Sequence, residues 1–216
     1  MSARDEPLMV SEGYPFVALT GFLALFFAAV DLHGPAWILF ILTFAAGAFF
    51  RNPHRRIPED AKAIVCPADG KVLEVQRVEA GLAGMIGPCW KVGIFMSPLN
   101  VHVNRSPVSG KVLRKTYKPG HFHVASRPEA GRENERMEMV LEAEAGFVLG
   151  VVQIAGVAAR RIVCYPGEGD ALVKGERFGL IRFGSRLEIY LPEGTTPAVR
   201  VGQHVKAGET IVGYGT

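Results

Sequence analysis

The chain has 216 residues, of which 49% are hydrophobic and 21% are charged, and its formal net charge at pH 7 is +3. A mean hydropathy of +0.19 is too high for an average soluble domain, whereas the charged fraction is too high for a protein that crosses a membrane many times. Three widely spaced cysteines, Cys66, Cys89 and Cys164, predict neither a disulfide framework nor a zinc knuckle, and we expect them to be small core residues.

The apolar excess lies near the amino terminus, in two segments joined by a turn. Only two side chains of this region would strongly resist a bilayer, Asp31 and His33, and both lie at the turn. Residues 14–32 are long enough to span a hydrocarbon core of about 30 Å, whereas residues 35–50 would reach only about 24 Å as a helix. We therefore predict a membrane-associated helical hairpin over residues 1–50, which spans the bilayer or only enters it.

Positive charges flank this hairpin but are absent from its turn. Arg51, Arg55 and Arg56 follow the second segment, and Arg4 precedes the first. Because cytoplasmic flanks carry the excess of lysine and arginine, both ends are predicted to face the cytoplasm. A cleaved signal peptide is disfavoured because a second apolar segment follows, and a simple anchor stays an alternative. The basic cluster suits an anionic membrane surface. The interleaved aromatic and basic residues that are typical of nucleic-acid binding do not appear in the sequence.

Residues 51–216 have short apolar runs separated by glycine and proline, which predicts a β-rich domain. Residues 187–191 alternate apolar and polar side chains, as in a half-buried strand, and Ser185 would lie at its start. Residues 201–213 have the glycine-turn rhythm of lipoyl and biotinyl carrier domains. We predict a mainly β (α+β) fold, with a barrel-sandwich-hybrid-like domain after the hydrophobic helical hairpin.

The tripeptide Phe183-Gly184-Ser185 points to self-cleavage. A serine after glycine can attack the carbonyl behind it, because glycine does not crowd that carbonyl and tolerates strained backbone. The peptide would become an ester, and elimination across the serine Cα and Cβ would leave dehydroalanine, which loses ammonia to become a pyruvoyl group. The alternative is a glycine at a strand bulge.

A serine nucleophile needs a base, and His102 is the best candidate by its local sequence. Asp69, in Asp69-Gly70, could orient the imidazole as the third member of a triad. A structural histidine on a strand and an ordinary Asp-Gly hairpin turn are the alternatives.

Two further patterns suggest ligand binding. His121 and His123 would point the same way on a strand and could share zinc with His102, as in a metal hydrolase. Three cations of a polar region could bind a phosphate or a carboxylate, or could form a solvated charged loop. These cations are Lys118, Arg132 and Arg136.

Five motifs, taken in order, resemble those of phosphatidylserine decarboxylases, particularly the short prokaryotic type. They are Pro67-Ala68-Asp69-Gly70, the stretch from Met96-Ser97-Pro98 to His102, Gly120-His121-Phe122, Asn134-Glu135-Arg136 and Phe183-Gly184-Ser185. The apolar hairpin followed by Phe50-Arg51-Asn52-Pro53 fits this resemblance too.

The resemblance implies a proenzyme that cuts itself between Gly184 and Ser185. The products would be a β chain of residues 1–184 and an α chain of residues 185–216, whose first residue becomes the pyruvoyl cofactor. The implied reaction is decarboxylation of phosphatidylserine to phosphatidylethanolamine, through a Schiff base between the substrate amine and the pyruvoyl ketone.

The resemblance also implies roles for individual residues, with His102 as base and acid and Asp69 as its orienter. Many longer members have a second histidine three places after the first, where this chain has Arg105. Another group could therefore share the work of His102. No metal is expected, and the substrate-binding candidates are Arg105, His121, Phe122, Asn134 and Arg136.

The expected partners are a phospholipid substrate, the membrane and the α and β chains of one precursor; a homo-oligomer stays open, and no nucleic acid is expected. The expected location is the inner cell membrane, with the catalytic domain on the cytoplasmic face. The alternative is a membrane-anchored, lipoyl- or biotinyl-like binding module without catalysis, for which Lys71 is the closest candidate for modification.

Overall fold

The structure is a computed structural model, and it describes residues 7–85, 87–157, 161–182 and 184–215. The chain divides into two compact units, Met1–His54 and Arg55–Thr216. The division falls shortly after the apolar part of the sequence ends.

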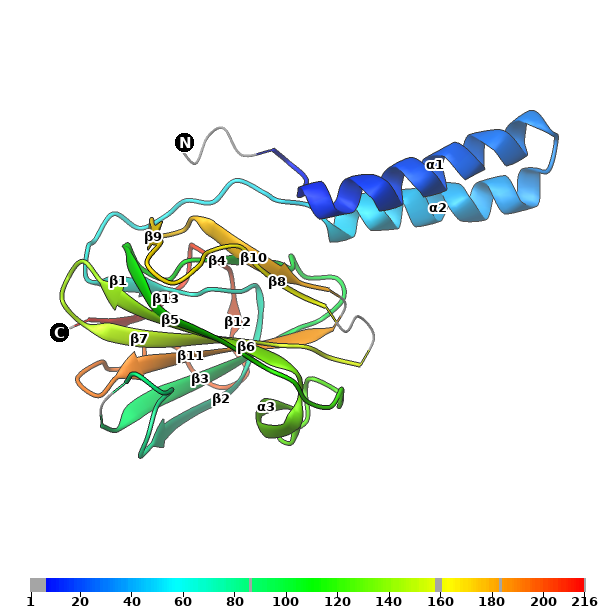
Figure 1. Cartoon of the computed structure of the whole chain (residues 1–216). Coiled ribbons are helices and arrows are strands. Elements are labelled where there is room, and N and C mark those ends of the chain that lie inside the picture. Colours follow the sequence, from blue (N-terminus) through cyan, green and yellow to red (C-terminus); the bar gives the residue numbers. More distant parts are fainter. Residues whose placement is uncertain (1–6, 86, 158–160, 183, 216) are drawn as a thin grey trace. The chain divides into compact units, whose positions relative to one another are not determined.

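The first unit is a helical hairpin. Its elements are the 3-10 turn η1 (Ser11–Gly13) and the helices α1 (Tyr14–Ala29) and α2 (His33–Phe49) (Figure 1). In the turn between the helices, Asp31 has a φ of 60°, a left-handed conformation that aspartate tolerates better than most residues. The Thr43 hydroxyl donates to Thr20 Oγ1 at 2.9 Å, and such polar contacts help to join apolar helices.

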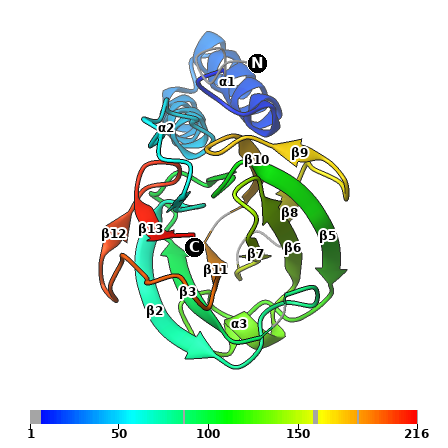
Figure 2. The same cartoon turned by 90° about the vertical axis from the view of Figure 1, so that its left-hand side faces the viewer.

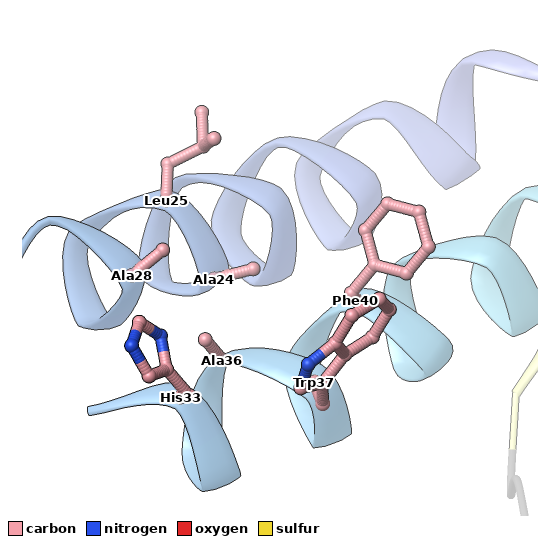
Figure 3. Close-up of a pocket in the computed structure, with 7 residues that line it drawn as sticks. All are labelled: Ala24, Leu25, Ala28, His33, Ala36, Trp37 and Phe40. Carbon is pink, nitrogen blue, oxygen red and sulfur yellow. The ribbon is translucent and has the colours of Figure 1, made fainter. Parts of the chain in front are cut away.

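The hairpin carries the hydrophobic helices that the sequence predicts. Ser11–Ala29 is long and apolar enough to cross a membrane, whereas α2 is apolar but shorter. Near the turn, small side chains leave a groove of about 320 Å³ between the helices (Figure 3). It is lined by Ala24, Leu25, Ala28, His33, Ala36, Trp37 and Phe40. The first of these helices is compatible with membrane association.

The second unit is built mostly of strands, as predicted. In chain order the strands before its short helix are β1 (Ala63–Val65), β2 (Gly70–Val78), β3 (Cys89–Met96), β4 (Val103–Arg105) and β5 (Gly110–Lys118). After α3 (Ala130–Glu133) come β6 (Arg136–Ala143), β7 (Val148–Ile154), β8 (Ile162–Cys164), β9 (Ala171–Leu172), β10 (Arg177–Ile181), β11 (Ser185–Pro192), β12 (His204–Val205) and β13 (Ile211–Tyr214). The mainly β fold is therefore confirmed.

The largest sheet has eight strands in the order β12-β2-β3-β11-β7-β6-β5-β9, and it curls into a half-barrel (Figure 2). A three-stranded sheet has the order β4-β10-β8, and β1 pairs with β13. The strand β11 lies between β3 and β7, with Ser185 opposite Met96 and Arg186 opposite Ile154. The start of β11 is thus held in the middle of the large sheet.

The strand β11 is buried on both faces, so the prediction of a half-buried strand is wrong. Leu187, Ile189 and Leu191 belong to the main core, as the alternation indicates. On the other face, however, Arg186 and Glu188 are 3% and 1% exposed. Alternation in the sequence identifies two faces but does not reveal what covers the polar one.

The cover of the polar face comes from elements distant in the chain. The helix α3 lies so close that a Cβ added to Gly131 would be 2.7 Å from Glu188 Oε1. Leu82, in the loop between β2 and β3, packs in a second apolar cluster with residues that include Ile154 and Tyr190. The two sides of the large sheet therefore have separate cores.

Candidate active site

Ser185 is the first residue of β11, and it is fully buried. Its hydroxyl lies 3.5 Å from Met96 Sδ, across the strand pair. The preceding Gly184 has a φ of +66°, a left-handed conformation that glycine adopts without the steric cost that a side chain adds. Phe183, the first residue of the tripeptide, lies outside the described residues. The backbone thus turns sharply into the central strand at the predicted cleavage point.

His102 lies just before β4 and is 1% exposed. Its Nδ1 is 3.0 Å from the carbonyl oxygen of Asn100. Because a carbonyl oxygen can only accept, Nδ1 carries the hydrogen in the neutral ring, and the lone pair is on Nε2. The ring is therefore in the tautomer that can accept a proton at Nε2, as a general base must. No hydrogen bond joins it to Ser185 in the described part of the chain.

Asp69 does not contact His102 through any hydrogen bond between described residues. Its Oδ2 is 2.9 Å from Arg55 Nη2, and its Oδ1 accepts the backbone N–H of Ala207 at 2.8 Å. The described contact to His102 Nδ1 comes from the Asn100 carbonyl, and the role of Asp69 as orienter of the imidazole stays a prediction. Between the described residues, no hydrogen bond thus joins Ser185, His102 and Asp69 to one another.

A buried amide pair lies near Ser185, and the sequence analysis missed it. Gln153 Nε2 donates to Asn104 Oδ1 at 2.8 Å, and Asn104 Nδ2 lies 3.8 Å from Met96 Sδ, the sulfur that Ser185 also approaches. Both amides are at most 1% exposed. Among the described residues, Gln153 Oε1 has no hydrogen-bond partner. The polar Gln153 within the apolar run of β7 was the signal that could have revealed this pair.

Asn134 has a structural role in this arrangement. Its Oδ1 accepts the backbone N–H of His123 at 2.8 Å, and its Nδ2 donates to the carbonyl oxygens of His123 and Ala155, at 2.9 and 2.8 Å. The amide thus joins the His121–His123 region to the end of β7. Because these contacts occupy both ends of the amide, the structure does not favour the predicted direct contact between Asn134 and a substrate.

The two neighbouring histidines differ in their surroundings. The rings of His121 and His123 are 5.6 Å apart, and His123 Nε2 is 2.9 Å from Glu133 Oε2. His121 is exposed and Phe122 is half-buried, so both side chains are accessible from solvent. Within the described ranges, no three His, Cys, Asp or Glu side chains form a group that could hold a metal ion. The three histidines of the zinc hydrolase alternative therefore do not form such a group in this part of the chain.

The candidate anion-binding cations are mostly engaged by other groups. Lys118 and Arg136 both form ion pairs with Glu138. Arg132 is exposed and forms no ion pair with any residue that the structure describes. Arg105 is 4% exposed and donates from Nη1 to the Gly175 carbonyl at 2.8 Å. Arg132 is thus the most accessible of these four cations.

An ion-pair network lies behind the start of β11, and the sequence analysis did not predict it. Arg186 pairs with Glu188 on the same strand and with Glu74 on β2, and Lys91 on β3 also pairs with Glu74. The Tyr190 hydroxyl donates to Glu188 at 2.9 Å. Burial, the negative charge of Glu188 and this hydrogen bond raise the pKa of Tyr190. The network connects the central strand to its neighbours directly after Ser185.

The predicted core cysteines are found in this unit as free thiols. Cys66 and Cys89 are buried, whereas Cys164 is partly exposed. Burial raises the pKa of the Cys66 thiol to about 12. A thiol with such a pKa is unreactive at physiological pH.

The candidate lysine of the carrier alternative lies within a strand. Lys71 is opposite Phe95 on β3 and His204 on β12, so it does not occupy the hairpin tip that a carrier lysine needs. The glycine turns that the carrier-like sequence pattern predicts are present, because Gly202 and Gly208 have φ values of 88° and 77°.

Comparison with known proteins shows the class of protein to which the chain belongs. The family profile described as phosphatidylserine decarboxylase matches residues 42–213. The chain is therefore an enzyme of the decarboxylase class, which goes against the alternative of a binding module without catalysis.

Similar proteins agree over nearly the full chain. The phosphatidylserine decarboxylase proenzyme of Geobacter sulfurreducens is 47% identical, and that of Citrifermentans bemidjiense is 48% identical; in both cases the match covers 99% of this chain and 99% of the relative. The proenzyme of Paraburkholderia phymatum is 42% identical, over 96% of this chain and 97% of the relative. The chain belongs to the phosphatidylserine decarboxylase family, which confirms the resemblance seen in its motifs.

Proposed function

We propose that this enzyme converts phosphatidylserine to phosphatidylethanolamine, using a pyruvoyl group that it makes by cutting its own chain between Gly184 and Ser185. The observation that carries the proposal is the position of Ser185. It is a fully buried serine at the start of the central strand, directly after a left-handed glycine. The family membership supplies the substrate class, and the names of the relatives describe proenzymes.

Self-cleavage would begin at the Ser185 hydroxyl. Oγ attacks the carbonyl carbon of Gly184, the C–N bond between residues 184 and 185 breaks, and the hydroxyl proton ends on the released amine, which leaves an ester. Loss of the Ser185 Cα proton then breaks the Cβ–Oγ bond, releases the Gly184 carboxylate and leaves dehydroalanine. Water replaces the amine of dehydroalanine, ammonia departs, and a pyruvoyl group begins the new chain.

His102 is our candidate for the base in this sequence and for the proton donor in turnover. The contact between Nδ1 and the Asn100 carbonyl supports this role, because it leaves the lone pair on Nε2. A proton that Nε2 accepts can be returned later to the carbon that loses carbon dioxide. Asp69 is less suited to assist directly, since Arg55 and Ala207 already occupy its carboxylate oxygens.

The residues around Ser185 fit a pyruvoyl group. Such a group supplies a ketone that condenses with the substrate amine and draws electrons from the bond that breaks. Ser185 is shielded from bulk water, and Gln153 Oε1, in the adjoining buried amide pair, could accept a hydrogen bond from the substrate amine that condenses with this ketone. We propose that Asn104 and Gln153 line this site, and that His121, Phe122 and Arg132 contact the lipid where the site opens.

We further propose that the hairpin anchors the enzyme at the inner membrane, with both ends in the cytoplasm. The apolar length of Ser11–Ala29 supports an anchor, and the arginines after α2 support the orientation. Flotation of the full chain with lipid vesicles tests the anchor, and a tag accessible only from the periplasmic side would contradict the orientation.

The decisive experiment is the intact mass of the purified protein under denaturing conditions, followed by a decarboxylation assay with phosphatidylserine. We expect two chains, one ending at Gly184 and one starting with a pyruvoyl group in place of Ser185. The Ser185→Ala variant should stay uncut and inactive. A cut, active Ser185→Ala protein would overturn the proposal, and so would an uncut but active wild type.

A further inference from the structure

Gly156, just after β7, lies against the carbonyl group that Ser185 would attack. A Cβ added to Gly156 would overlap the carbonyl oxygen of Gly184 and would lie 2.9 Å from its carbonyl carbon. This is the closest approach found at any described glycine. The same Cβ would also be 3.4 Å from Ala125 Cβ. Only a residue without a side chain therefore fits here with the Gly184 carbonyl in its present position.

The backbone before Gly156 is held firmly and has little freedom to retreat. The Ala155 N–H donates to the Glu135 carbonyl at 2.9 Å, and the Ala155 carbonyl accepts from Asn134 Nδ2 at 2.8 Å. Ile154 pairs with Arg186 on β11, so β7 runs beside the strand that Ser185 begins. A methyl group at residue 156 would consequently displace the Gly184 carbonyl rather than its own backbone.

We propose that Gly156 is a positioning residue for self-cleavage, because its bare Cα lets the Gly184 carbonyl lie where Ser185 Oγ can reach the carbonyl carbon. The inference rests on the proposed function and adds to it a residue outside the five motifs. Geometry is decisive at such a step, since a misplacement of about 1 Å between reacting groups can slow a reaction by about 100-fold. No substrate contact is required of Gly156.

The test compares the maturation of Gly156→Ala with that of Gly167→Ala. At Gly167 a Cβ would meet only Asp170 Oδ2, at an ordinary 3.7 Å, so this variant is a matched control in the same unit. We follow intact masses over time after synthesis of the full chain. The wild type and Gly167→Ala should mature alike, and Gly156→Ala should mature at least about 100-fold more slowly.

Hydroxylamine identifies the step that is blocked. It attacks the Gly184 carbonyl of the ester and releases Ser185 with a free amine, so it cuts any chain that has already formed the ester. Gly156→Ala should stay uncut in hydroxylamine, because the attack by Oγ fails before the ester exists. Two chains with a serine start would show that the attack succeeds in this variant, and would overturn the assigned role.

A second measurement distinguishes a positioning role of Gly156 from a folding defect of the Gly156→Ala variant. In the uncut Ser185→Ala background, we expect Gly156→Ala to unfold cooperatively, within a few degrees of the parent. Loss of that transition, or maturation of the single variant at the wild-type rate, would overturn the inference. A wild type that never cuts itself would instead refute the proposed function, so the two failures are distinguishable.

Discussion

Arg55 and Asp69 form an ion pair with Nη2 and Oδ2 2.9 Å apart, and both side chains are largely buried. Removing one member of a buried pair leaves an uncompensated charge, which typically costs about 3–5 kcal/mol. We expect Asp69→Asn and Arg55→Gln to lose comparable free energy of unfolding, measured by urea denaturation in the uncut Ser185→Ala background.

The same two substitutions test the triad interpretation of Asp69. If Asp69 acts through its pair with Arg55, both variants should mature at similar rates in the presence of Ser185. A much slower maturation of Asp69→Asn than of Arg55→Gln would instead favour Asp69 as the orienter of His102.

Replacing the proposed base should slow maturation selectively. A positioned base typically contributes about 10²–10⁴-fold to a rate, so we expect His102→Gln to mature more slowly by a factor in this range. His121→Gln is the control, because His121 is an exposed histidine in the same unit and is not expected to act in cleavage. Time courses of intact mass provide the measurement, and equal rates for the two variants would remove His102 from the mechanism.

Removing one member of the Arg186–Glu188 ion pair should cost more free energy of unfolding than removing both. Arg186→Met leaves Glu188 buried without its closest partner, and we expect a loss of about 3–5 kcal/mol in the free energy of unfolding. The double variant Arg186→Met/Glu188→Met should lose less than Arg186→Met alone, because two apolar side chains of similar size restore packing without a buried charge. Urea unfolding in the uncut background gives the comparison, and a double variant less stable than the single one would contradict this account.

The buried Cys66 thiol predicts how stability changes at high pH. Its pKa rises from 9.0 to about 12 in the folded protein, so above pH 9 the unfolded chain loses this proton while the folded chain keeps it. The free energy of unfolding should therefore fall by about 1.4 kcal/mol per pH unit between pH 9 and 12, through this group alone. The Cys66→Ala variant lacks this contribution, so its stability should fall less steeply over the same range.

Denaturant titrations at pH 8 and pH 10.5 compare the wild type with Cys66→Ala while other groups, such as Tyr190, contribute equally to both. Parallel losses of stability would show that the thiol titrates near its ordinary pKa in the fold.

Local patterns in the sequence were sufficient for some features of this protein. The run of apolar residues determines the helices α1 and α2, and the alternation after Ser185 determines which side chains of β11 enter the main core. The five motifs, taken in their order along the chain, were sufficient to predict the family. These features depend on residues close together in the chain, where periodicity and turn chemistry act directly.

Only the tertiary structure decided which distant groups meet. It brings Asp69 to Arg55 rather than to His102, joins Asn104 to Gln153, and covers the polar face of β11 so that Arg186 and Glu188 are buried. The approach of Gly156 to Gly184 likewise depends on two strands that are neighbours only in the folded sheet. Sequence patterns report the preferences of each segment, whereas such contacts depend on how all the strands pack and on which burial the whole fold can stabilise.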